Sequence, residues 1–139
     1  MSPFEVSDDL KQRAASQLAL NPVAQTLGMY LTDLRPMNAT IVIDMHDNLR
    51  QPNGVLHGGV TAALIDTAMA FAVITCMSEG EKASTIDLTV HYLRPHTDGK
   101  VTCKATVDRA GKKIFTVSAD VINEQNKLIA KAISTYTKV

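Results

Sequence analysis

The strongest constraint on the fold is a long apolar stretch, residues 58–77, whose only charged residue is Asp66. A helix that is apolar nearly all round must be covered by the rest of the chain on most sides. A carboxylate in such surroundings is costly unless it is paired, hydrogen-bonded or used in chemistry. The stretch opens with His57-Gly58-Gly59, and glycines at a helix N-terminus leave backbone N–H groups uncovered as an anion site. An oxyanion-binding turn and a lone carboxylate on one element suggest acyl-transfer chemistry.

The segments on either side of this helix carry helix and strand signals. Ser7 is a suitable N-cap because two acids follow it in the first turn, and Asn21-Pro22 ends that helix. From residue 83 onward, apolar and polar residues alternate with a period of two, as in half-buried strands. The predicted elements are a helix at 7–20, strands at about 27–34 and 39–46, a loop at 47–56, the long helix, and four strands that end at residue 137, with breaks at 95–100, 109–113 and 123–126.

These elements predict one α+β domain over residues 1–139. A curved antiparallel sheet wrapped round the long central helix covers it on most sides, and the four C-terminal strands form a meander with short turns. Residues 1–20 add an N-terminal helical extension. A chain of 139 residues is long enough to build such a core without disulfide bonds.

Charge and hydropathy exclude several kinds of partner. The 14 basic and 14 acidic residues cancel, whereas a protein that binds nucleic acid needs a basic excess or stripe. Residues 60–77 approach the length of a membrane span, but Asp66, several threonines and the lack of a flanking basic cluster favour a core helix and no membrane partner. The N-terminus lacks a basic segment followed by an apolar one, so we expect no signal peptide and a cytoplasmic protein.

The cysteines and histidines show no metal-binding pattern. Cys76 and Cys103 lack metal or redox spacing and are predicted to be free, buried thiols in a reducing compartment. His91 and His96 have no ligand spacing, and both are expected to face solvent together with Asp87. We therefore predict no metal site.

Three segments together resemble the hotdog fold, and more narrowly the acyl-CoA thioesterases of the phenylacetate-degradation type. They are Asn53-Gly-Val-Leu-His57-Gly58-Gly59, then Asp66 within Leu-Ile-Asp-Thr-Ala, and the alternating strand from Thr85 to Arg94-Pro95. The resemblance covers about residues 20–139. It implies hydrolysis of an acyl or aryl thioester to a free acid and coenzyme A. It implies no cofactor, because coenzyme A is part of the substrate.

The spacing of Gly58 and Asp66 predicts an oligomer. Eight residues of helix place them roughly 12 Å apart at ~1.5 Å per residue. The oxyanion donor and the attacking or activating group must each lie about 3 Å from the scissile carbonyl. Asp66 of one subunit should therefore face Gly58 of its neighbour, which agrees with family members, whose sites lie at the dimer interface. A homodimer is the expected minimal unit, and a homotetramer is the expected assembly.

Asp66 and Gly58 are the central catalytic candidates. Asp66 acts as nucleophile or general base, the alternative being a structural acid. Family members use the amide of the glycine after the histidine to polarise the thioester carbonyl, and Gly58 matches that position; a glycine needed only for a tight turn is the alternative. A thiol with a pKa near ~8.5 leaves readily, so one carboxylate and an oxyanion hole can suffice.

The remaining catalytic candidates are assigned through the same resemblance. His57 is either an N-cap hydrogen-bonded to the loop or a substrate contact. Gln51 stands where related enzymes carry Asn or Gln near the thioester. Thr85 stands where relatives use a hydroxyl to hold the attacking water, although threonine also favours strands.

The predicted substrate-binding residues lie in the glycine motif and in basic positions. Asn53 and Gly59 belong to the motif, with close packing as a second explanation of Gly59. Family members bind the phosphates of coenzyme A through basic residues near the turn at 109–113; the candidates here are Arg94, Lys112 and Lys113. A solvated basic turn is the alternative.

Two other functions fit a similar fold. A hotdog dehydratase acts on a hydroxyacyl thioester, but it uses a histidine within a different motif. An acyl-CoA sensing module usually carries a DNA-binding segment, and residues 1–20 are too short for a helix-turn-helix. The acyl group stays open, because aromatic residues make up only 4% of the chain and Trp is absent. Phe71, Tyr92 and Phe115 remain as possible aryl contacts.

Overall fold

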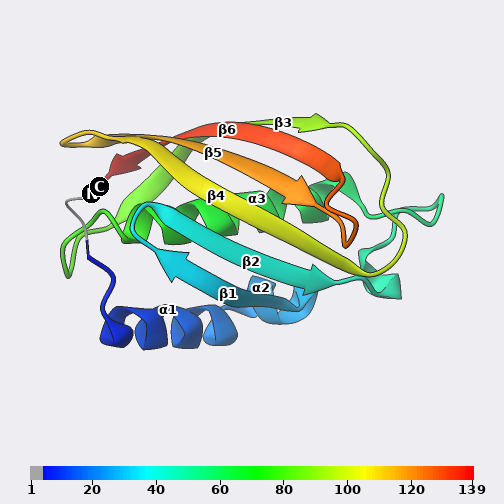
Figure 1. Ribbon diagram of the computed structural model, residues 1–139, viewed down its shortest axis with the longest axis horizontal. Helices are drawn as coiled ribbons and strands as arrows, with labels where there is room; N and C mark the ends of the chain where they lie inside the picture. Colours follow the sequence, from blue (N-terminus) through cyan, green and yellow to red (C-terminus); the bar gives the residue numbers. More distant parts are fainter. Residues whose placement is uncertain (1–4) are drawn as a thin grey trace.

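The computed structural model describes residues 5–139 and consists of a curved antiparallel sheet that packs on one long helix (Figure 1). Residues 1–4 lie outside the described residues. They include the start of the predicted domain and of the N-terminal segment from which we expected no signal peptide. The sheet has six strands in the order β1-β2-β4-β5-β6-β3. The elements are α1 (Asp8–Leu20), α2 (Pro22–Leu27), β1 (Met29–Arg35), β2 (Asn38–Asp44), η1 (Asp47–Leu49), α3 (Gly58–Ile74), β3 (Ala83–Tyr92), β4 (Lys100–Ala110), β5 (Ile114–Ile122) and β6 (Leu128–Lys138).

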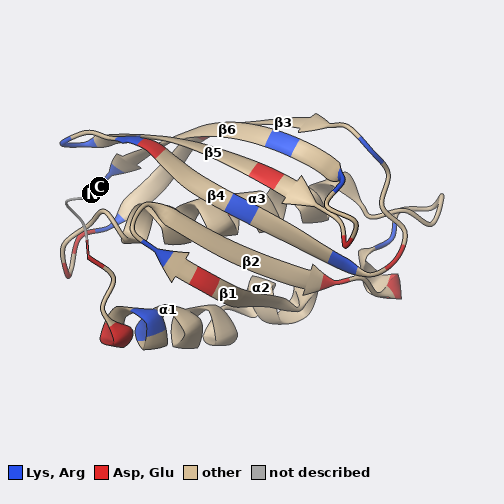
Figure 2. Cartoon of the chain, in the orientation of Figure 1, with Lys and Arg blue, Asp and Glu red and all other residues tan. Residues whose placement is uncertain are grey.

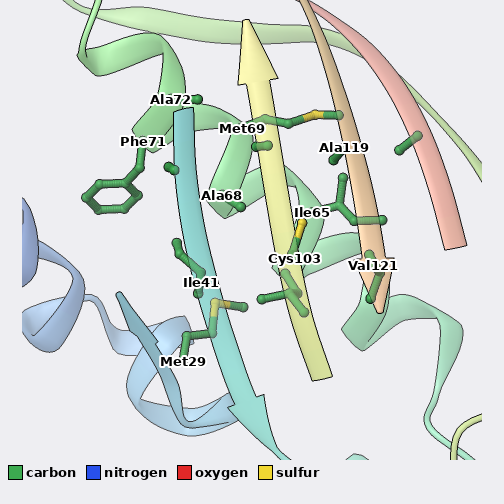
Figure 3. Packing of buried hydrophobic residues seen from close by; sticks show 14 of the residues in the cluster. Met29, Ile41, Ile65, Ala68, Met69, Phe71, Ala72, Cys103, Ala119 and Val121 are labelled. Carbon is green, nitrogen blue, oxygen red and sulfur yellow. The ribbon is translucent and has the colours of Figure 1, made fainter. Parts of the chain in front are cut away.

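Helix α3 forms the centre of the core, as predicted. Ile65, Ala68 and Met69 are fully buried and point at the inner face of the sheet, where Cys103 and Val121 meet them (Figure 3). Each large apolar side chain buried in this way contributes about 1.5–3 kcal/mol. Strands β2, β4, β5 and β6 supply alternate residues to this layer. Among residues 5–139, no helix combines the length and the hydropathy that crossing a membrane requires.

The N-terminal region corrects one detail of the prediction. Helix α1 has the expected Ser7 cap, which accepts a hydrogen bond from the Leu10 N–H, and it ends at Leu20. Helical structure resumes immediately, because Pro22 suits the first turn of a helix and Asn21 caps α2 through the Ala24 N–H. The predicted strand therefore begins at Met29 rather than near residue 27.

The position of β3 corrects the predicted meander. Strands β4, β5 and β6 do pair in succession, but β3 pairs with β6 instead of β4. Residues 93–99 therefore cross one end of the sheet instead of forming a hairpin turn (Figure 1). Alternation reveals which face a residue takes but not which strand lies alongside. As a result, β3 is an edge strand, and its apolar residue Ile86 is 55% exposed.

Burial of the cysteines and histidines matches the predictions except at one residue. Cys76 and Cys103 are free and buried, and desolvation raises the pKa of both thiols. Asp87 and His91 are exposed as expected. His96 was expected to face solvent and is only 5% exposed, because its carbonyl accepts the Leu56 N–H and its Nε2 lies 3.3 Å from the Gly99 carbonyl oxygen.

Candidate active site

The side chain of Asp66 is held by two hydroxyl groups. Its Oδ1 accepts hydrogen bonds from Thr85 Oγ1 at 2.7 Å and from Tyr136 Oη at 2.6 Å. The same tyrosine hydroxyl lies 2.7 Å from the Asp66 carbonyl oxygen. None of the ion pairs within residues 5–139 includes Asp66. The carboxylate is therefore oriented by neutral donors and keeps its charge unpaired by any cation of the described chain.

The second oxygen of the carboxylate, Oδ2, receives no hydrogen bond from the described residues. Every buried side-chain nitrogen or oxygen of the described residues has a partner, so Oδ2 is not a buried orphan and retains contact with solvent. One oxygen is thus fixed and the other is free. A free carboxylate oxygen in a fixed orientation can take a proton from water or attack a carbonyl.

Sequence reasoning missed Tyr136, the deepest member of this cluster. It is only 2% exposed, and burial followed by the hydrogen bond to Asp66 raises the pKa of its hydroxyl. The hydroxyl therefore keeps its proton near neutral pH and remains a hydrogen-bond donor. The available signal was a buried tyrosine on the inner face of a strand, since a buried phenol needs a polar partner. Its partner depends on the register that aligns Tyr136 with Thr85, and the sequence pattern does not reveal that register.

The N-terminus of α3 carries one free amide. His57 is the N-cap, and its Nδ1 accepts the Gly59 N–H at 2.9 Å. The Gly58 N–H makes no hydrogen bond within residues 5–139, as is usual for the first residue of a helix. The helix dipole adds a partial positive charge at this end. Of the two glycines in the motif, Gly58 therefore offers its N–H to a ligand, whereas the Gly59 N–H is used inside the turn.

Tyr92, which the sequence suggested only as an aryl contact, holds this helix end. Its hydroxyl donates to the Gly58 carbonyl oxygen at 2.7 Å. A Cβ at residue 58 would lie 3.3 Å from the Tyr92 ring, so the glycine allows the close approach of strand and helix. Thr85 and Tyr92 lie near opposite ends of β3, so this strand contacts both the carboxylate and the free amide.

The loop before His57 contains the other polar candidates. Gln51 Oε1 accepts the Asn53 N–H at 2.6 Å, so this side-chain oxygen is used inside the loop. Arg50, which sequence reasoning did not single out, donates to the carbonyl oxygens of Gly54 and Thr97 at 2.8 and 2.7 Å. Arg50 thereby joins this loop to the segment that crosses the end of the sheet.

The basic candidates are not brought together within one chain. The Arg94 N–H bonds to the Ile129 carbonyl oxygen at one end of β6, whereas the Lys113 carbonyl oxygen accepts the Lys138 N–H at the other end. These two positions on β6 are nine residues apart, which is roughly 30 Å at ~3.3 Å per residue. Figure 2 shows basic residues at both ends of the sheet. Lys112 lies beside Lys113, so one protomer does not form the predicted phosphate contact from all three residues.

Asp66 and Gly58 lie eight residues apart on the same helix, α3. Half-buried residues line the outward face of α3 around Asp66, among them Ala62, Ala70 and Ile74. The described residues contain no group of three or more His, Cys, Asp or Glu side chains arranged to hold a metal ion. The arrangement thus offers a carboxylate and an amide, separated by about 12 Å of helix, beside an unpaired strand edge.

The sequence and the structure are both similar to known proteins. The family model of the thioesterase superfamily matches residues 53–130. A thioesterase structure from Haemophilus influenzae has a TM-score of 0.88 at 29% identity, covering 98% of this chain and 94% of that one. The PaaI protein of the Escherichia coli phenylacetic acid degradation operon has a TM-score of 0.84 at 25% identity, covering 93% and 92%. The E. coli medium/long-chain acyl-CoA thioesterase YigI is 34% identical over 95 residues, which are 59% of this chain and 61% of YigI.

Proposed function

Because the chain belongs to the thioesterase superfamily, we propose that it hydrolyses acyl-CoA thioesters with Asp66 of one subunit and the Gly58 N–H of another. The hotdog fold and the assignment as a thioester hydrolase follow from the family, and the choice of residues is our proposal. The observation that carries it is the hydroxyl pair on Asp66 Oδ1, which leaves Oδ2 free. The names of YigI and its relatives support an acyl-CoA as the substrate.

In the proposed reaction, the Gly58 N–H donates to the thioester carbonyl oxygen as negative charge develops there. Asp66 Oδ2 takes a proton from water, the water oxygen bonds to the carbonyl carbon, and the carbon–sulfur bond breaks to release the coenzyme A thiolate. One preorganised oxyanion donor contributes about 10²–10³ in kcat. No further cofactor is required, because coenzyme A is part of the substrate.

A two-fold dimer is proposed because one chain cannot supply both groups to one carbonyl. The two groups are about 12 Å apart along α3, and each must lie about 3 Å from the reacting atoms. The unpaired edge of β3 and the outer face of the N-terminal half of α3, where Ala62 is half-buried, offer a self-complementary surface beside Asp66. Antiparallel packing of two α3 helices then sets Asp66 of each subunit against Gly58 of the other. Pairing of two such dimers into a tetramer is part of the same proposal.

The other candidate residues take supporting roles in this proposal. Gln51 and Asn53 shape the loop beside the thioester, and His57 with Gly59 holds the turn that presents the free amide. We propose that the phosphates of coenzyme A contact Arg94 of one subunit and the turn that bears Lys112 and Lys113.

The decisive variants are Gly58→Pro and Asp66→Asn. Proline suits the first position of a helix and lacks the N–H, and His57 already has the extended backbone that a following proline requires. Gly58→Ala adds a similar Cβ and keeps the N–H, so it is the matched control. We expect kcat of Gly58→Pro to fall about 10²-fold below that of Gly58→Ala, as for loss of one oxyanion donor.

Mixing the two inactive variants then tests the shared site. In a heterodimer of Asp66→Asn and Gly58→Pro chains, one of the two sites keeps both native groups. With random subunit exchange, about a quarter of wild-type thiol release should return. Absence of any recovery in a proven heterodimer, or full activity of a monomer, would contradict the proposal.

A further inference from the structure

An open cavity of about 290 Å³ lies between the C-terminal half of α3 and the first residues of β3. Four of its seven lining residues are apolar, namely Ala70, Ile74, Met77 and Ala83, and the other three are Tyr136, Glu81 and Lys82. We propose that this cavity receives the acyl group and selects straight chains of medium length. The inference rests on the proposed function, because it assumes a thioester carbonyl beside Asp66.

The cavity lies next to the carboxylate, because its lining residue Tyr136 donates to Asp66 Oδ1. Ala70 and Ile74 follow Asp66 in steps of four residues, so all three lie on one face of α3. Tyr136 lines the cavity with its ring and donates to Asp66 Oδ1 with its hydroxyl. Thr85, the other donor to this oxygen, follows two residues after Ala83 on β3. A carbonyl held at Asp66 therefore has an apolar path leading away from it along α3.

The two halves of the substrate require different surroundings. Coenzyme A is large and charged, so it must extend toward solvent. The acyl chain is stabilised by each methylene group that leaves water. The cavity beside Ile74 provides this apolar surface. It lies toward the C-terminal end of α3, whereas the N-terminus of the same helix lies on the other side of Asp66.

The dimensions of the cavity limit the chain. From Asp66 to Ile74 the helix rises about 12 Å. An extended chain advances about 1.2 Å per bond, so about ten bonds cover this distance. The volume of about 290 Å³ is nearly twice the ~150 Å³ that suffices for benzene. An octanoyl or decanoyl chain therefore matches both the length and the volume.

An ion pair lies at the far end of the cavity. Glu81 Oε2 lies 2.9 Å from Lys138 Nζ, with 34% and 28% of the two side chains exposed, and Glu81 Oε1 accepts the Ser78 N–H. Lys138 holds the pKa of Glu81 below its ordinary value, with a smaller contribution from the Ser78 N–H, so the pair is charged near neutral pH. A longer chain would press methylene groups against these charges and displace their water. The pair therefore disfavours chains that reach beyond Met77.

The test is a chain-length profile of kcat/KM, from butyryl-CoA to palmitoyl-CoA, for wild type and Ile74→Trp. The larger side chain should lower kcat/KM for decanoyl-CoA at least about 10-fold and leave butyryl-CoA within about three-fold. Ala70→Leu provides a milder second obstruction if Ile74→Trp proves unstable on thermal unfolding. Ile133→Trp is the matched control, because Ile133 is 62% exposed on β6 and does not line the cavity.

A complementary variant opens the far end. Replacing both Glu81→Leu and Lys138→Met should raise kcat/KM for palmitoyl-CoA relative to decanoyl-CoA by about 10-fold. Equal effects of Ile74→Trp on all chain lengths, or the same shift in the Ile133→Trp control, would overturn the acyl pocket and leave the proposed function intact. If wild type releases no thiol from any chain length, the proposed function itself fails.

Discussion

At the scale of single residues, the two oxygens of Asp66 have different surroundings. Thr85 and Tyr136 both donate to Oδ1, and neither donates to Oδ2. Hydrogen bonds to a charged group contribute about 1.5–3 kcal/mol each. The pair therefore holds the carboxylate in one rotamer and leaves its other oxygen without a donor from the described residues. We regard Tyr136 as a positioning residue, because it acts through Asp66.

Tyr136→Phe tests this positioning role. The variant keeps the buried ring and removes the donor, so kcat should fall about 10- to 100-fold while KM changes little, because misorientation affects the reaction more than binding. The measurement is steady-state thiol release with the acyl-CoA that wild type prefers. Tyr30→Phe, which alters a half-exposed tyrosine on β1, should retain wild-type kinetics. A rise in KM without loss of kcat would contradict the assignment.

The sequence revealed the residues of the site that depend on local structure. The motif around His57 and Gly58 forms a helix cap, and a cap is decided by neighbours along the chain. Asp66 is conspicuous as the only charge of an apolar helix. Tyr136 and Arg50 are different, because their partners are distant in sequence and follow from strand register and loop packing. Such partners are invisible to periodicity.

At the scale of elements, β3 connects the two halves of the site. Its residue Thr85 bonds to the carboxylate in the middle of α3, and Tyr92 bonds to the Gly58 carbonyl at the start of α3. The sequence predicted β3 as a strand but placed it beside β4. Its true neighbour is β6, because the chain crosses the sheet after β3. Turn-like residues at 95–100 fit either connection, so the order of strands could not be inferred.

Tyr92→Phe tests the contact between β3 and the end of α3. Removing the hydroxyl frees the Gly58 carbonyl, and the adjoining amide loses part of its fixed direction. We expect kcat/KM to fall about 10-fold, the size of one lost neutral hydrogen bond at a positioned group. Circular dichroism and thermal unfolding should remain close to wild type, since Tyr92 is 56% exposed. An unchanged kcat/KM would show that the amide is held by the His57 cap alone.

At the scale of the whole molecule, the sequence predicted a sheet around a central helix but did not predict which strands form the edges of that sheet. A helix apolar on nearly all sides requires a curved sheet around it, and this prediction is confirmed. The short helix α2 was missed because Pro22 both ends one helix and begins the next. The sheet edges follow from strand order, which determines the surfaces left for a partner.

Buried acidic groups make the folded protein sensitive to alkali. Burial raises the pKa of the Cys76 and Cys103 thiols and of the Tyr136 hydroxyl, so the folded protein holds these protons to higher pH than the unfolded chain does. The unfolded chain releases them above their ordinary pKa values, near ~8.5 and ~10, and so binds fewer protons there. The free energy of unfolding should therefore be constant near neutral pH and fall as pH rises through this range.

Urea titrations at a series of alkaline pH values measure this fall. Tyr136→Phe removes one of these three groups, so its unfolding free energy should decline less steeply than that of wild type above pH ~10. Tyr30→Phe serves as the control, because the Tyr30 hydroxyl lies at a half-exposed position. Identical slopes for Tyr136→Phe and wild type would exclude a contribution from this hydroxyl.

The two ends of β3 have a consequence for mixed populations of subunits. Thr85 bonds to Asp66 of its own chain, and Tyr92 bonds to Gly58 of its own chain, yet in the proposed dimer these two groups serve different catalytic centres. A subunit with Asp66→Asn disables one centre and leaves the other working. A subunit whose β3 is displaced disables both, including the centre that uses the healthy partner's carboxylate. Substitutions that displace this strand should therefore lower the activity of mixed dimers dominantly when normal and defective subunits are expressed together.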